Sequence, residues 1–172
     1  MKKSKIFIVL GLIFFLGILT SILMVKNKPI NNIPSTSLPI QYLNQFKLYT
    51  TTKQPIVQII SNKKTIINFW APWCSPCIKE IPMLNKFYAA NKDRIQFIGI
   101  GIDNQKNIDN FQQKINIDYP ISIAGLEGIE LAKNLGNNIG ALPYTVVLDA
   151  NGKIISKYTG ELTVEQLQEW TK

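Results

Sequence analysis

The chain has 172 residues, 46% of them hydrophobic, which is enough apolar material for a folded core and excludes a fully disordered chain. It has two cysteines and no histidine, which excludes a disulfide-rich scaffold, Ser-His-Asp or Cys-His catalysis and nearly every zinc enzyme site. The formal net charge is +8, but outside residues 1–28 the chain carries 14 basic and 11 acidic residues. That is an ordinary soluble surface, so no nucleic-acid partner is expected.

Residues 6–25 form a run of twenty residues without a charge. As a helix this run spans about 30 Å, the thickness of a bilayer hydrocarbon core. It is longer than the apolar region of a cleaved signal peptide and lacks an A-x-A-like cleavage site, which favours an uncleaved anchor. Three lysines precede the run and two follow it, so the N-terminus is expected in the cytoplasm.

Residues 1–28 are therefore expected to form a cytoplasmic tip and a transmembrane signal-anchor helix. This helix would cross the cytoplasmic (inner) membrane once and place the rest of the chain on the extracytoplasmic or periplasmic side. Residues 29–44 are rich in Asn, Pro, Ser and Thr, which is typical of a flexible tether. Residues 45–172 remain as the folded domain.

Strand and helix patterns alternate along the folded domain. Two short β-prone runs, 46–49 and 56–60, are expected to form an edge hairpin. Beyond them the patterns predict strands at 65–69, 95–102, 145–148 and 153–158, a short extended piece at 119–123, and helices after Cys77 and at 107–114, 129–135 and 164–170. A capping box of Thr163 and Gln166 begins the last helix. This order predicts an α/β domain with a mixed sheet and helices on its faces.

Two cysteines, Cys74 and Cys77, lie where a buried strand ends and a helix begins, in the sequence WAPWCSPC. The free N–H groups and partial positive charge of a helix N-terminus stabilise a thiolate on Cys74, and thiolate is the nucleophile in thiol–disulfide exchange. Cys77, one helical turn later, is within reach of the resulting mixed disulfide. On a helical wheel Ile81, Leu84 and Tyr88 lie within about 40° of Cys77, so this helix buries the face that carries it.

Two other roles are open to the cysteine pair. A structural disulfide closing so short a loop would contribute only about 2 kcal/mol through loop entropy. Half of a zinc site would need further soft ligands, and the chain has no other Cys or His. Redox catalysis without a bound cofactor or metal is the favoured role.

The segments FWAPWCSPC and ALPYTVVLDANGKI, together with the anchor, resemble the thioredoxin superfamily over about residues 44–172. More narrowly, they resemble its membrane-anchored, extracytoplasmic TlpA/ResA-like thiol–disulfide oxidoreductases. Forty positions separate Asp103 from Pro143, Glu80 completes a C-x-x-C-x-x-E-x-P pattern, and Asn68 stands where cytosolic thioredoxin has a buried acid. The resemblance implies a thioredoxin-like three-layer sandwich with an N-terminal hairpin and a central insertion of one helix and one strand.

The resemblance also implies roles for residues around the cysteines. Cys74 would attack and Cys77 would resolve. Pro143 would be a cis proline facing the disulfide, and the backbone of Leu142 would pair with an extended substrate segment. Trp73 and Pro76 would shape the surface around the active sulfur.

Glu80 lies about 60° from Cys77 on the helical wheel, at the edge of the buried face. One interpretation is a partly exposed acid in the first turn, favoured by the helix dipole. The other is a half-buried carboxyl with a raised pKa, which would relay a proton to or from Cys77. The family resemblance supports the second interpretation.

The favoured function is reduction of disulfides in extracytoplasmic client proteins by a monomeric enzyme that a membrane thiol carrier re-reduces. The resemblance suggests apocytochrome c as a client. The alternatives are a disulfide-forming oxidase with the same architecture and a non-catalytic copper or haem chaperone. A thiol peroxidase is disfavoured because Ala71 stands where peroxiredoxins carry a threonine.

Overall fold

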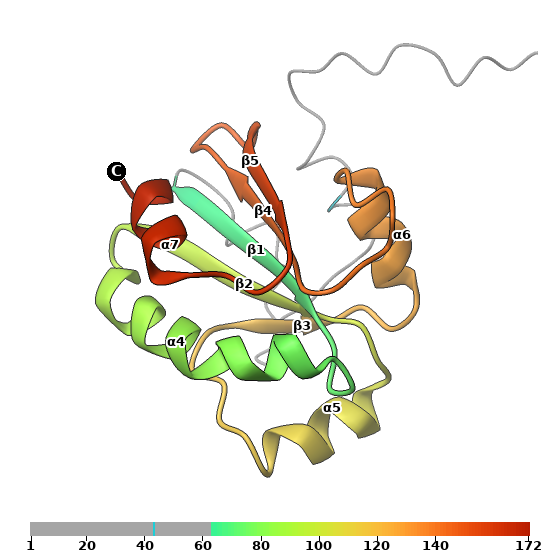
Figure 1. Ribbon diagram of the computed structural model, residues 1–172. Helices are drawn as coiled ribbons and strands as arrows, with labels where there is room; N and C mark the ends of the chain where they lie inside the picture. Colours follow the sequence, from blue (N-terminus) through green and yellow to red (C-terminus); the bar gives the residue numbers. More distant parts are fainter. Residues whose placement is uncertain (1–42, 44–62) are drawn as a thin grey trace, which may run out of the picture. The chain divides into compact units, whose positions relative to one another are not determined.

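The structure is a computed structural model that describes residue 43 and residues 63–172 (Figure 1). The expected membrane anchor, nearly all of the expected tether and the expected hairpin at 46–49 and 56–60 lie outside the described residues. Among the helices that are described, none has the length and hydropathy needed to cross a membrane. Leu43 is helical and fully buried in the hydrophobic core.

A five-stranded mixed sheet organises the described domain. The strands lie in the order β3-β2-β1-β4-β5, with β1, β2 and β3 parallel and with β4 and β5 antiparallel to their neighbours. In chain order the elements are β1 (Lys64–Trp70), α4 (Ser75–Asn91), β2 (Ile95–Gly101), α5 (Gln105–Gln112), β3 (Ile121–Ile123), α6 (Glu127–Asn134), β4 (Tyr144–Leu148), β5 (Ile154–Thr159) and α7 (Val164–Trp170).

Every strand and helix predicted beyond residue 63 is present, with bounds that differ by one or two residues. The central strands β1 and β2 are buried along nearly their whole length, as their continuous apolar runs predict, whereas the edge strand β5 alternates between half-buried and exposed residues. The capping box of α7 is formed, with the Thr163 side chain accepting from the Gln166 backbone N–H and the Gln166 side chain accepting from Thr163.

Helices cover both faces of the sheet, which confirms the predicted layered α/β architecture. Alternate side chains of β1 point to opposite faces: Asn68 and Trp70 face the side that α4 and α5 cover, and Trp70 stacks on Phe111 of α5 with ring centroids 5.2 Å apart. On the other face, the Tyr144 hydroxyl of β4 donates to the backbone oxygen of Leu135, directly after α6. Helix α7 packs beside α4.

The central insertion is also present. Helix α5, strand β3 and helix α6 all lie between β2 and the loop that carries Pro143, and β3 extends the sheet beyond β2 (Figure 1). The 40 positions between Asp103 and Pro143 are thus used for two helices and an edge strand.

Candidate active site

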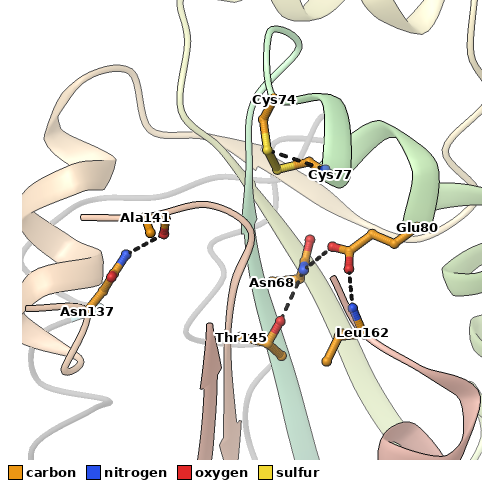
Figure 2. The surroundings of a disulfide bond; sticks show 8 residues. All are labelled: Asn68, Cys74, Cys77, Glu80, Asn137, Ala141, Thr145 and Leu162. Carbon is orange, nitrogen blue, oxygen red and sulfur yellow. Dashed lines mark hydrogen bonds between the residues drawn. A yellow bond between two sulfur atoms is a disulfide. The ribbon is translucent and has the colours of Figure 1, made fainter. Parts of the chain in front are cut away.

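The cysteine pair lies at the carboxyl end of β1, where the chain turns into α4 (Figure 2). Cys74 and Cys77 form a disulfide with their Cα atoms 5.2 Å apart. Cys74 is the N-cap residue of α4, and its Sγ accepts a hydrogen bond from the Cys77 backbone N–H at 3.3 Å. The predicted placement at a helix N-terminus is therefore confirmed, and the free N–H groups there would stabilise a thiolate on Cys74 in the reduced protein.

The two sulfur-bearing residues differ in access. Cys74 keeps 5% of its surface exposed, whereas Cys77 is fully buried on the face of α4 that packs on the sheet. An external disulfide could reach Cys74 but not Cys77, which matches the attacking and resolving roles that the resemblance implies. Ile81 and Leu84 share the buried face as predicted, while Tyr88 is only half-buried.

Two residues predicted to shape the surface around the active sulfur, Trp73 and Pro76, lie within two positions of Cys74 in the chain. Trp73 is 65% exposed, an unusual position for so large an apolar side chain, and Pro76 is half-buried in the first turn of α4. Trp70, by contrast, is only 1% exposed and belongs to the core. The exposed Trp73 is therefore available at the surface, whereas the buried Trp70 contributes to core packing.

The loop before β4 contains the predicted cis peptide bond, between Leu142 and Pro143. Pro143 is buried and its backbone oxygen accepts from the Gly160 N–H at 2.9 Å. The side-chain amide of the buried Asn137 donates to the backbone oxygen of Ala141 at 2.9 Å and so ties this loop to the end of α6 (Figure 2). The pairing of Leu142 with a substrate remains a prediction.

A groove of about 350 Å³ opens next to Trp73, and the sequence analysis did not identify it. It is lined by residues of the active-site loop, of α5 and of the segments directly before and after α5, namely Pro72, Trp73, Asp103, Asn107, Asn110, Phe111 and Lys114. One carboxylate oxygen of Asp103 accepts from the Asn104 N–H and from the Asn107 side-chain amide, both at 2.7 Å, which holds part of the rim in place. The only sequence signal for it was the insertion itself, which brings α5 to this side.

Glu80 lies beneath the disulfide and is only 2% exposed. The interpretation of Glu80 as a partly exposed acid is therefore wrong, because the α4 face at its position turns toward the sheet. Its Oε1 accepts from the Asn68 side-chain amide and its Oε2 from the Leu162 backbone N–H, both at 2.9 Å (Figure 2).

Burial raises the pKa of Glu80 from 4.5 to about 7, because the carboxylate is poorly solvated there. The hydrogen bonds from Leu162 and Asn68 lower the pKa and partly oppose this effect, and the nearby charge of Glu161 raises it slightly. A carboxyl with a pKa near neutrality can both take up and release a proton under physiological conditions.

Three residues of the buried cluster around Glu80 were not predicted as such from the sequence: Asn68 and Leu162, which donate to Glu80, and Thr145, which accepts from Asn68. The sequence marks Asn68 only by its position and gives no signal for Thr145 or Leu162. Asn68 and Thr145 are opposite each other in the β1–β4 register, and the Asn68 amide donates to the Thr145 hydroxyl at 3.1 Å. No sequence spacing indicates this register, because the two strands are 77 positions apart in the chain.

Within residue 43 and residues 63–172 there is no group of three His, Cys, Asp or Glu side chains able to hold a metal ion. The redox chemistry available at this site is that of its own cysteine pair, which exchanges electrons through thiol and disulfide forms.

Comparison with known proteins places this site in a family. The Redoxin family model matches residues 31–169. The thiol-disulfide oxidoreductase ResA of Bacillus thuringiensis subsp. konkukian is 34% identical over 112 residues, which are 64% of this chain and 62% of ResA. The sporulation thiol-disulfide oxidoreductase A of Bacillus subtilis is 34% identical over 120 residues, which are 66% of this chain and 70% of that protein.

Solved structures agree in fold. The crystal structure of StoA from Bacillus subtilis superposes with a TM-score of 0.62 at 30% identity and covers 73% of this chain and 94% of StoA. A thioredoxin-related protein from Neisseria meningitidis serogroup B superposes with a TM-score of 0.59 at 35% identity, covering 66% of this chain and 86% of that one.

The alignments with the ResA proteins span somewhat less than two thirds of those proteins' own length. The Redoxin match covers most of the chain, and the disulfide, the helix N-terminus and the five-stranded sheet agree with it. The chain therefore belongs to the redoxin family and is a ResA-like member of the thioredoxin superfamily.

Proposed function

We propose that this protein is a thiol–disulfide oxidoreductase that reduces disulfides in extracytoplasmic client proteins. The observation that carries the proposal is the Cys74–Cys77 disulfide at the N-terminus of α4, with the outer sulfur accessible and a buried carboxyl beneath it. The names of the ResA and StoA relatives, which are thiol-disulfide oxidoreductases, support it.

In the proposed reaction the Cys74 thiolate attacks one sulfur of the client disulfide. A Cys74–client bond forms, the client S–S bond breaks, and the client sulfur that leaves takes up a proton. Cys77 then loses its proton and attacks the Cys74 sulfur, which releases the second client sulfur as a thiol. The client gains two electrons and two protons, and the protein is left with the disulfide seen in the structure.

Glu80 would receive the proton from Cys77 in the second step. It is three residues beyond Cys77, one helical turn along the same buried face of α4. Its pKa of about 7 lets it accept this proton near neutral pH and return it when the disulfide is reduced again.

Client binding would involve Trp73 and Pro76 beside the attacking sulfur and the backbone of Leu142 before Pro143. A thiol carrier in the membrane would resupply electrons, and the N-terminal anchor would hold the enzyme, as a monomer, outside the cytoplasm. Apocytochrome c, whose haem-binding cysteines must be reduced before haem attachment, is the client class that the family resemblance favours.

The reduction potential of the full-length protein in detergent tests the direction of the reaction. Equilibration with glutathione or dithiothreitol buffers should give a value near or below about −230 mV, which suits a reductase. A value near −120 mV, typical of a strong oxidant, would refute reduction and make this protein a disulfide-forming oxidase.

Trapping tests the roles of the two cysteines. The Cys77→Ser variant should accumulate a mixed disulfide with a peptide disulfide, because the resolving sulfur is gone. The Cys74→Ser variant is the matched control and should trap nothing, since Cys77 is fully buried. Equal trapping by both variants would contradict the assignment.

A further inference from the structure

We infer that Asn68 is a positioning residue that links Glu80 to Cys77. Its amide nitrogen holds the Glu80 carboxylate, and in the reduced protein its amide oxygen accepts a hydrogen bond from the Cys77 thiol. This inference rests on the proposed dithiol chemistry, and it concerns the state that follows reduction of the disulfide.

The donor side of the Asn68 amide is fully used. A side-chain amide has two N–H donors, and here one donates to Glu80 Oε1 at 2.9 Å and the other to Thr145 Oγ1 at 3.1 Å. Both partners are buried, and Asn68 itself is 1% exposed on the central strand β1. Two acceptors on separate elements therefore clamp the amide in one orientation.

The acceptor of the Asn68 side-chain amide, by contrast, has no partner among the residues that the structure describes. The acceptor atom, Asn68 Oδ1, is buried. Figure 2 shows this oxygen on the side of the amide that faces the Cys74–Cys77 disulfide. Buried acceptors in proteins are nearly always paired, so an unpaired one beside a redox centre indicates a partner that is present in another state of the molecule.

Reduction supplies such a partner. In the disulfide neither sulfur carries a hydrogen, but in the dithiol Cys77 gains an S–H donor. Cys77 is fully buried and cannot donate to bulk water. The amide oxygen of Asn68 lies on the side of the amide that faces the two cysteines, and it can accept a hydrogen bond from the Cys77 thiol.

The two ends of the amide then act together. An acceptor facing the thiol favours protonated Cys77, and a donor facing the carboxylate favours ionised Glu80. Asn68 thus favours the state in which the proton is on Cys77 and Glu80 is ionised and able to receive it.

The other titratable groups near Glu80 are Glu161, which precedes α7, and Tyr119, which precedes β3. The charge of Glu161 adds slightly to the pKa of Glu80, and burial followed by the Glu80 charge raises the pKa of Tyr119, which stays neutral. Neither group offers Cys77 a charge that reverses this expectation.

The test is a titration of Cys77 in full-length protein carrying Cys74→Ser, where Cys77 is the only thiol. Thiolate absorbance near 240 nm is followed against pH with and without Asn68→Leu, which keeps the approximate size but removes both ends of the amide. Loss of the hydrogen bond to the thiol should lower the apparent pKa of Cys77 by about 0.5–1 pH unit. An unchanged or raised pKa would overturn the inference.

Asn68→Asp provides an independent check if the leucine variant does not fold. An ionised Asp at this position keeps an acceptor for the thiol and adds a negative charge, so it should raise the pKa of Cys77, the opposite direction. Thr145→Val is the matched control, since it alters only the second partner of the amide, and it should change the pKa by less than about 0.3. If Asn68→Asp lowered the pKa, or if the control shifted as much as Asn68→Leu, a general packing effect would replace the inference.

This titration does not depend on catalysis. Wild-type protein that exchanged no disulfides would refute the proposed function and leave the Cys77 titration readable. A wild-type protein that is active and shows no effect of Asn68 would refute the inference alone.

Discussion

Replacing Glu80 with glutamine removes a buried ionisable group without removing its volume. In the folded protein the carboxyl has a pKa of about 7, against 4.5 as the ordinary value. The folded state therefore binds the proton more tightly than the unfolded chain does. The contribution of Glu80 to the free energy of unfolding is therefore fully present below about pH 4.5, and it is lost as the pH rises through 7.

The magnitude follows from the same two pKa values. A rise from 4.5 to about 7 corresponds to about 3 kcal/mol of unfolding free energy. Wild-type protein should lose about this much stability between pH 4.5 and pH 8.5 through Glu80 alone. Glu80→Gln stays neutral, and like the protonated acid it offers one acceptor oxygen to the two donors, Asn68 and Leu162.

Urea unfolding of the full chain with its disulfide intact, at pH values from 4.5 to 8.5, measures the effect. The stability difference between Glu80→Gln and wild type should change by about 3 kcal/mol in favour of the variant over this range. Glu169→Gln, at an exposed position of α7, is the control and should follow wild type throughout. Parallel pH profiles for wild type and Glu80→Gln would refute the assignment of a near-neutral pKa to this carboxyl.

Four further substitutions test the packing of the domain and the surface beside the site by urea unfolding and activity. Trp70→Ala should lower the free energy of unfolding by about 3–5 kcal/mol, because the side chain is 1% exposed. Trp73→Ala, at 65% exposure, should lower it by under about 0.5 kcal/mol yet reduce kcat/KM for peptide disulfides. A larger stability loss for Trp73→Ala than for Trp70→Ala would contradict the division between core and surface. Thr163→Ala removes the α7 cap and should cost about 1 kcal/mol, so an unchanged midpoint would show that the capping box contributes little. Gly99→Ala would place a Cβ 2.9 Å from the Tyr119 ring and should destabilise by about 1–3 kcal/mol; a neutral effect would mean that the ring moves freely.

The regular elements were predictable because they depend on short-range patterns. Continuous apolar runs marked β1 and β2, and a Thr–Gln pair three residues apart marked the start of α7. The cis state of the Leu142–Pro143 bond came from the family resemblance, since nothing in its local sequence distinguishes it from an ordinary proline loop.

The groove beside Trp73 was not predictable in this way. Its walls come from the active-site loop and from α5, two segments that meet only when the insertion packs beside the carboxyl end of β1. The side-chain amides of Asn107 and Asn110 appear in the sequence as part of an ordinary polar helix face, and only the fold places them beside an exposed tryptophan.

The sequence alone determined where the reactive pair lies, because a strand end, a helix start and a spacing of one turn are local properties of residues 65–77. It also placed Glu80 near the buried face, because helical periodicity is local. Only the tertiary structure decided that Glu80 is buried, that Asn68 and Leu162 donate to it, and that Thr145 holds Asn68. These partners are 12 to 82 positions apart along the chain, and the pKa of a carboxyl depends on the solvent and charges that distant segments exclude or supply, which local spacing does not record.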